Sequence, residues 1–131
     1  MAFGYQLLMD LYDCESHACD DLEMCYRFLE EIVGFLKVEK QAPPAVFRTD
    51  VSRAPHLAGL SGWVPLLESS VVIHTLTDMK YVSVDIFSCK IFDRQSAVYF
   101  AQSYFASKHV ESTLVLRGQQ VWSERPSHVR G

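Results

Sequence analysis

The chain has 131 residues, of which 49% are hydrophobic and 21% charged, and its formal net charge at pH 7 is −4. This length suits one globular domain with its own core. The negative charge and the lack of a lysine and arginine cluster argue against a nucleic-acid partner, and the short apolar runs predict no membrane span. The first residues lack the basic and apolar regions of a signal peptide, so we expect a cytoplasmic protein.

The first third of the chain predicts one strand and one helix. Apolar residues alternate over residues 4–12, as in a strand with one buried face. Asp10 falls on the other face, where a surface carboxylate is favoured over a charged network beside a site. Residues 20–23 have the spacing of a capping box, and a helix with one apolar side follows to about Val38. We expect this helix to cover a sheet.

The middle of the chain predicts two short strands separated by a loop. Pro43 and Pro44 break the chain before a strand candidate at 45–48. Residues 49–59 are polar and form a loop, where a segment that covers a substrate would be useful. Residues 61–67 form the next strand, which lies at an edge or is interrupted because Pro65 cannot donate a hydrogen bond.

The second half predicts three strands and one helix. Apolar strands at 70–76 and 81–88 are joined by a short polar turn. Asp93 is the expected N-cap of a second helix, a last strand covers 110–116, and the tail from Gln119 is expected to be loose. The order β-α-β-β-β-β-α-β predicts an α+β fold, a two-layer α/β sandwich whose mostly antiparallel sheet carries both helices on one face. No domain boundary is visible in residues 1–131.

Three of the four cysteines lie close together in the sequence. Cys14, His17, Cys19 and Cys25 raise the possibility of zinc, but their spacings match no common zinc pattern. Cys25 also falls on the apolar side of the first predicted helix. We therefore expect no metal and mostly buried, reduced thiols.

Residues able to carry chemistry concentrate between positions 67 and 89. Ser69 opens one strand, His74 lies near its end, and Cys89 ends the next strand. Taken singly, these are an ordinary strand-start serine, a core histidine and a buried cysteine. Two strands nevertheless form a rigid platform that can hold a nucleophile, a base and a thiol in fixed relation.

Four motifs in this order resemble the signature of the small prokaryotic S-adenosylmethionine decarboxylases. They are Ser61-Gly62, Glu68-Ser69, Ile73-His74-Thr75 and Val84-Asp85-Ile86-Phe87-Ser88-Cys89. The resemblance extends from Gly4 to about Gly118. Members of that family are α+β proteins that pair as dimers. They are made as proenzymes and cut themselves before a serine, which becomes a covalent pyruvoyl group.

The resemblance implies cleavage into residues 1–68 and 69–131, a pyruvoyl group derived from Ser69, a homodimer, and S-adenosylmethionine as a small cationic substrate.

Decarboxylation of an α-amino acid needs an electron sink. Pyridoxal phosphate, the usual one, needs an active-site lysine and a phosphate cradle, and the chain has few lysines and no glycine-rich phosphate loop. A pyruvoyl group made from a serine needs neither.

The resemblance also implies a role for each motif residue. The Ser69 hydroxyl attacks the carbonyl of Glu68. Ser61 and His74 match the residues that assist processing, with the histidine as the base for elimination, a task that suits its near-neutral pKa. Cys89 matches the thiol that returns a proton to the substrate's α-carbon.

The sequence departs from the family where substrate is held. After His-Thr the family continues Trp-Pro-Glu, and this chain has Leu76-Thr77-Asp78; after Glu-Ser it often has His, and this chain has Ser70. The family's glutamate holds the ribose hydroxyls, a role that Asp78 would take with a shorter side chain. Phe3 is the candidate for stacking on the adenine.

These departures keep three functions open. The first is a pyruvoyl-dependent S-adenosylmethionine decarboxylase that supplies aminopropyl groups for spermidine synthesis. The second is a pyruvoyl-dependent decarboxylase of another cationic amino acid, arginine or ornithine. The third is an unprocessed, non-catalytic paralogue that acts as a binding or regulatory subunit.

Overall fold

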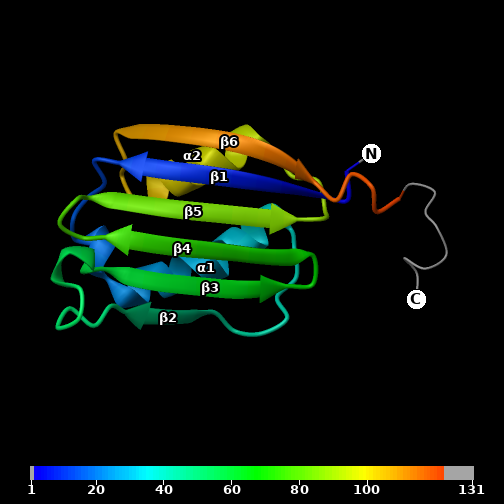
Figure 1. Ribbon diagram of the computed structural model, residues 1–131. Helices are drawn as coiled ribbons and strands as arrows, with labels where there is room; N and C mark the ends of the chain where they lie inside the picture. Colours follow the sequence, from blue (N-terminus) through cyan, green and yellow to red (C-terminus); the bar gives the residue numbers. More distant parts are fainter. Residues whose placement is uncertain (1, 123–131) are drawn as a thin grey trace.

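The computed structural model describes residues 2–122, which form a sheet of six strands and two α-helices (Figure 1). The elements follow the predicted order: β1 (Gly4–Tyr12), α1 (Leu22–Leu36), β2 (Ala45–Arg48), β3 (Leu60–Leu66), β4 (Ser69–Leu76), β5 (Tyr81–Ser88), α2 (Arg94–Tyr104) and β6 (His109–Arg117). Short 3₁₀ turns at Ala18–Asp20 and Pro55–Leu57 interrupt the loops before α1 and β3.

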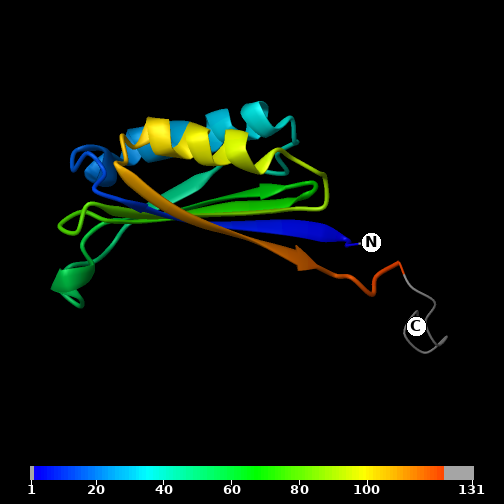
Figure 2. The same cartoon turned by 90° about the horizontal axis from the view of Figure 1, so that it is seen from above.

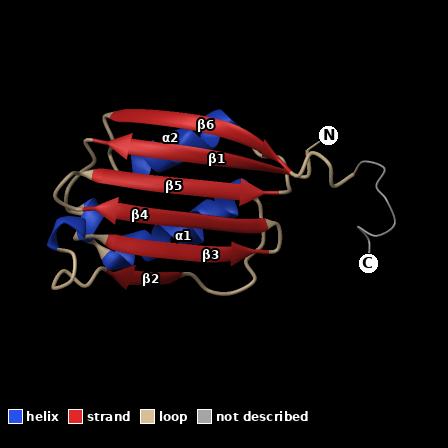
Figure 3. Ribbon diagram, in the orientation of Figure 1, coloured by secondary structure: helices blue, strands red, loops and turns tan. Residues whose placement is uncertain are grey.

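The strand order is β2-β3-β4-β5-β1-β6, and each pair of neighbours is antiparallel. Strands β3, β4 and β5 follow one another as hairpins, whereas β1 lies between β5 and β6. Helices α1 and α2 cover the same face of the sheet and leave the opposite face uncovered (Figures 2 and 3). The predicted two-layer α+β sandwich is confirmed.

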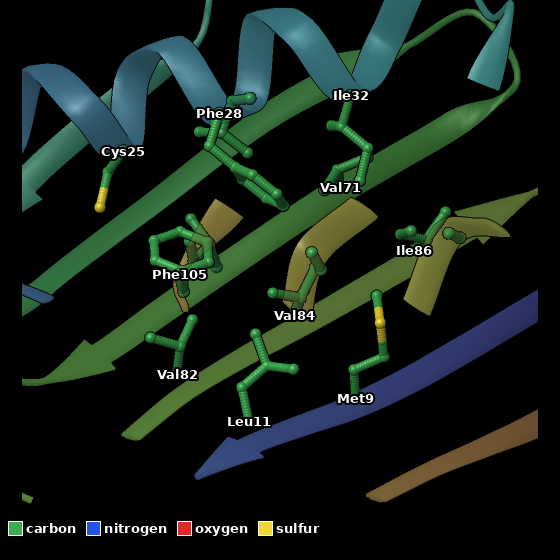
Figure 4. Packing of buried hydrophobic residues seen from close by; sticks show 14 of the residues in the cluster. Met9, Leu11, Cys25, Phe28, Ile32, Val71, Val82, Val84, Ile86 and Phe105 are labelled. Atoms are coloured by element: carbon green, nitrogen blue, oxygen red, sulfur yellow. The ribbon is translucent and has the colours of Figure 1, made fainter. Parts of the chain in front are cut away.

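The core lies between the sheet and the helices because alternate strand residues point toward α1 and α2. Phe28 of α1 and Phe105 are fully buried in this layer (Figure 4). The ring centroid of Phe28 lies 5.0 Å from that of Phe105 and 5.1 Å from that of Tyr104. Full burial of such a side chain contributes about 1.5–3 kcal/mol. The strands supply buried residues from β1, β4 and β5: Met9, Leu11, Val71, Val82, Val84 and Ile86.

Local signals set the ends of the helices. The Asp21 carboxylate caps α1 by accepting from the backbone N–H of Met24 at 3.0 Å, and Asp93 caps α2 through Ser96 at 2.9 Å, as predicted for Asp93. Helix α1 ends at Leu36, two residues before the predicted end, because Lys37 adopts a left-handed conformation with φ of 58°.

The pairing of β3 with β2 stops before Pro65, in agreement with the prediction from its missing N–H, whereas its pairing with β4 continues through Pro65. The ladder with β2 ends at the pair of Ala45 and Trp63, and only a bridge between Lys40 and Leu66 follows. At the other end of the chain, the expectation of a loose tail from Gln119 is wrong as far as Trp122. Gly118, with φ of 65°, turns the chain so that the Trp122 ring lies 5.8 Å from Phe3. The remainder of the predicted tail lies outside the described residues.

The cysteines divide into a buried set and one exposed thiol. Cys14, Cys19 and Cys25 are buried, and burial raises the pKa of Cys25 to about 12; Cys89 is exposed. In the part of the chain that the structure describes, no three His, Cys, Asp or Glu side chains are grouped so that they could hold a metal ion. Among residues 2–122, no helix has the length and apolar character needed to cross a membrane.

Candidate active site

The predicted cleavage junction lies in the turn between β3 and β4. Leu66 pairs with Ser69, so Leu67 and Glu68 form a two-residue hairpin turn. Ser69 has φ of 150°, a value that residues with a side chain rarely adopt. Such a conformation costs about 1–3 kcal/mol and persists where the surrounding structure enforces it. The backbone of Ser69, directly after the Glu68–Ser69 peptide bond, is therefore strained.

Neighbouring backbone groups hold this turn from two sides. The N–H of Cys89 donates to the carbonyl oxygen of Glu68 at 3.0 Å. On the other side, the Glu68 carboxylate accepts from the N–H of Glu39 at 3.1 Å, and the N–H of Leu67 donates to the carbonyl of Glu39 at 2.8 Å. A donor on the Glu68 carbonyl is placed where negative charge would develop if the Ser69 hydroxyl attacked that carbon.

Ser61 and His74 form a hydrogen-bonded pair on the uncovered face. They are opposite each other in the β3–β4 ladder, and Ser61 Oγ lies 2.9 Å from His74 Nδ1. The His74 side chain is exposed, so its Nε2 can form a hydrogen bond with another group. The ordinary interpretation of His74 as a core histidine is wrong, because β4 turns Val71, Ile73 and Thr75 toward the core and His74 away from it.

The strands beneath this pair are fixed by close polar contacts. The buried Thr75 hydroxyl donates to the carbonyl of Cys19 at 2.6 Å and accepts from the N–H of Leu60 at 2.9 Å. Gly59 packs so tightly that an added Cβ would lie 1.9 Å from the Thr75 carbonyl oxygen. A small pocket of about 210 Å³ opens beside His74, lined by Thr49, Leu57, Leu60, Ser61, His74, Thr75 and Leu76. The predicted covering loop thus contributes to a pocket beside the histidine.

Carboxylates lie near His74 on the same face. Asp85 pairs with Val72, two residues from His74, so both side chains share that face. Burial raises the pKa of Asp85, His74 lowers it, and Asp10 raises it. Asp10 is half-buried and accepts a hydrogen bond from the Tyr81 hydroxyl at 2.5 Å. The favoured prediction of a surface carboxylate for Asp10 is wrong, because Tyr81 of the adjacent strand reaches across to it.

Within the chain the predicted site residues form two separate groups. The junction group is Phe3, Glu68, Ser69 and Cys89. Ser69, Ser88 and Tyr5 lie in one row across β4, β5 and β1, which places all four members at the end of the sheet where β4 begins. The histidine group is Ser61, His74 and Asp78, toward the opposite end of β4.

The two groups do not meet within the chain. Ser69 and His74 are five residues apart on β4, which corresponds to about 16 Å at about 3.3 Å per residue. Asp78 lies in the turn after β4 and is further still from Ser69. The histidine therefore cannot contact the serine of its own chain in this fold.

Sequence reasoning assigned no role to three residues near these groups. Trp122 is 61% exposed and packs on Phe3, and its aromatic character was a signal that could have been used. Asp85 lies within the motif of residues 84–89, but no role was predicted for it. Glu39 contacts the junction through its main chain, for which the sequence carries no signal.

The geometry defines a class of protein: an antiparallel α+β sandwich in which a serine with a strained backbone follows a hydrogen-bonded carbonyl. A family model described as S-adenosylmethionine decarboxylase matches residues 5–118. The chain belongs to this family, and the resemblance seen in its motifs is confirmed.

Individual relatives agree with this assignment. The chain is 29% identical over 117 residues to an S-adenosylmethionine decarboxylase proenzyme of Clostridium botulinum, covering 88% of this chain and 95% of the relative. It is 29% identical over 113 residues to the proenzyme of that name from Pseudomonas aeruginosa, covering 85% and 66%. The crystal structure of the adenosylmethionine decarboxylase from Aquifex aeolicus VF5 has the same fold, with a TM-score of 0.77 at 23% identity over 95% of this chain and 98% of that one.

Proposed function

We propose that this protein is a pyruvoyl-dependent S-adenosylmethionine decarboxylase that supplies aminopropyl groups for spermidine synthesis. Family membership and the proenzymes among its relatives support this proposal. The observation that carries it is the Glu68–Ser69 junction, where a strained backbone and a donor on the Glu68 carbonyl favour attack by the Ser69 hydroxyl. The predicted cytoplasmic location and the lack of a nucleic-acid partner stay predictions.

Self-cleavage at this junction needs only chemistry available to a serine and a base. The Ser69 hydroxyl attacks the Glu68 carbonyl carbon and gives up its proton, and the peptide C–N bond breaks as its nitrogen is protonated, leaving an ester. Removal of the α-proton of residue 69 then expels the Glu68 carboxylate and leaves dehydroalanine. Addition of water and loss of ammonia give the pyruvoyl group. The sequence consumes one water molecule and requires no oxidant.

The surroundings of Ser69 fit a pyruvoyl group. Residue 69 begins β4 and is flanked by Leu66 and Ser88, so the strand holds its position after the bond to Glu68 is lost. The group would supply a carbonyl that binds the substrate amine and accepts the electrons left by departing carbon dioxide. The exposed thiol of Cys89, one residue beyond Ser88, would return a proton to the substrate's α-carbon.

A second copy of the chain would complete the site. The junction and histidine groups lie toward opposite ends of the sheet. A copy placed face to face, with its strands running in the opposite direction, would therefore bring its histidine group to the first copy's junction group. The uncovered face carries exposed apolar side chains suited to burial: Leu8 (36% exposed), Phe47 (67%) and Trp63 (47%). The proposed assembly is a homodimer in which His74 of one copy serves Ser69 of the other.

In this arrangement the remaining predicted residues would bind substrate. Asp78 of the second copy would accept hydrogen bonds from the ribose hydroxyls, and Phe3 of the first would lie against the adenine. Phe3 already stands at the junction end of the sheet, where Trp122 supports its ring. A pocket that hydrogen-bonds a substrate group discriminates strongly against analogues that lack it.

Two measurements test the proposal. Denaturing mass spectrometry should show two fragments, 1–68 and 69–131, with the second lacking a free amino terminus. Carbon dioxide release should then give a higher kcat/KM for S-adenosylmethionine than for arginine or ornithine. The opposite order would assign the pyruvoyl chemistry to another cationic amino acid. An intact chain after prolonged incubation, without carbon dioxide release, would favour the binding or regulatory subunit.

A further inference from the structure

The connector between α1 and β2 contacts both sides of the cleavage junction. Beyond the Glu39 contacts, the N–H of Gln41 donates to the carbonyl of Pro65 at 2.9 Å, and Lys40 forms a bridge with Leu66. Residues 39–41 thus run alongside residues 65–68 as a short additional strand segment. One of these contacts is made by a side chain, that of Glu68.

Two lysine side chains also anchor this connector. The Lys40 ammonium donates to the Glu30 carboxylate of α1, at 2.8 Å from Oε1. The Lys90 ammonium, one residue beyond Cys89, donates to the carbonyl of Lys37. The connector therefore links helix α1, the turn that carries Glu68, and the end of β5 that carries Cys89. Through these links the position of the Glu68 side chain is fixed relative to the Cys89 N–H.

We propose that the Glu68 side chain is a positioning group for self-cleavage, bound by the main-chain N–H of Glu39 so that the Glu68 carbonyl stays on the Cys89 N–H. This inference rests on the proposed function, because it concerns the rate of the proposed cut. Glu68 would thus contribute a side-chain tether in addition to the carbonyl that is attacked.

Rotation of the Glu68 peptide plane explains why such a tether matters. The two-residue turn has few contacts of its own, since Leu67 is 62% exposed. If the plane rotates, the carbonyl oxygen leaves the Cys89 N–H and the carbonyl carbon moves relative to the Ser69 hydroxyl. Small misplacements of reacting atoms lower rates strongly. The contact between the carboxylate and Glu39 opposes this rotation from the side of the turn opposite Cys89.

Two matched pairs of variants test the inference. Glu68→Ala removes the acceptor, whereas Glu68→Gln keeps an oxygen that can accept from the Glu39 N–H. Glu39→Pro removes the donor, whereas Glu39→Ala keeps it because Glu39 acts through its main chain. The rate of appearance of the two fragments is measured after pulse-labelled cell-free synthesis, and thermal unfolding of each variant is followed by circular dichroism.

We expect Glu68→Ala and Glu39→Pro to cut about tenfold more slowly than wild type, the effect of losing one charge-assisted hydrogen bond. Glu68→Gln and Glu39→Ala should cut at close to the wild-type rate. The inference is overturned if Glu68→Ala cuts as fast as wild type, or if Glu68→Gln is as slow as Glu68→Ala at equal thermal stability. Should Glu39→Pro not fold, the Glu68 pair alone decides. A wild-type chain that never cuts would instead refute the proposed function, and this inference with it.

Discussion

Cys89 offers two chemically distinct groups at one position. Its main-chain N–H donates to the Glu68 carbonyl at 3.0 Å, while its thiol is exposed. The N–H would act in processing and the thiol in turnover, at different times in the life of the molecule. A substitution that changes the side chain leaves the N–H in place, so the two functions can be separated experimentally.

Ser69→Ala should remain a single chain without activity, because it has no hydroxyl to form the ester. Cys89→Ala should still be cut, yet its kcat should fall by about 10²-fold or more, the usual contribution of a positioned proton donor. Mass spectrometry measures the cut, and carbon dioxide release measures turnover. Full activity of cleaved Cys89→Ala would show that the thiol is not the proton donor.

At the residue scale the motifs predicted the family, but not how the site residues are arranged. The pairing of Ser61 with His74 agrees with their expected joint role in processing. The separation of His74 from Ser69 follows from strand rise alone, but the order of residues in a motif does not show which chain completes a site. The contact between the Glu39 main chain and the junction could not be predicted, because any residue except proline supplies the same main-chain donor.

At the scale of elements, alternation and caps predicted most of the fold. Apolar residues at every second position identified β1, β4 and β5, and Asp93 marked the start of α2. The insertion of β1 between β5 and β6 could not be read from the sequence, because alternation shows which face of a strand is buried and not which strands are neighbours. The environment of Asp10 was missed for the same reason.

Strand β5 carries Asp85, and burial destabilises the charged form of its carboxylate. The pKa of Asp85 is raised in the folded protein, so the folded state binds its proton more tightly than the unfolded state. Protonation of Asp85 therefore stabilises the folded state. This stabilisation is complete below the pKa of the unfolded state, about 3.9, and is lost as the pH rises through the pKa of the folded state.

Asp85→Asn should therefore raise the melting temperature at pH 7, by about 2 °C, with the gain shrinking as pH falls toward about 4. Thermal unfolding across this pH range checks the prediction. Asp78→Asn, at an exposed position in the β4–β5 turn, is the matched control and should leave the melting temperature unchanged. A gain for Asp85→Asn that persists undiminished at pH 4 would contradict a titration effect.

At the scale of the whole molecule, the proposed dimer accounts for the distance between the two groups. One chain presents the junction group at one end of its sheet and the histidine group toward the other, and two opposed chains would form two complete sites. Each site would then depend on residues from both chains, so a defect in one chain could be complemented by the other.

Mixed dimers test this arrangement. Ser69→Ala and His74→Ala chains should each remain uncut when produced alone. When the two are produced together, the His74→Ala chain should be cut, because the Ser69→Ala chain supplies an intact His74. Mass spectrometry distinguishes the two chains by their masses. Cutting of His74→Ala on its own, at the wild-type rate, would remove the histidine from the processing step.

The strand order has a consequence for the cut proposed between Glu68 and Ser69. The fragment 1–68 holds β1, β2 and β3, and the fragment from residue 69 holds β4, β5 and β6. Among the described strands, the ladders β3–β4, β5–β1 and β1–β6 then join different polypeptides, which is three of the five. Because β1 is enclosed between two strands of the other fragment, the halves are interlaced and cannot separate without dismantling the sheet. Because the contacts proposed to favour the cut exist only in the folded sheet, folding would precede cutting. A cut molecule that unfolds would have to find its other half by diffusion, so its recovery would depend on concentration.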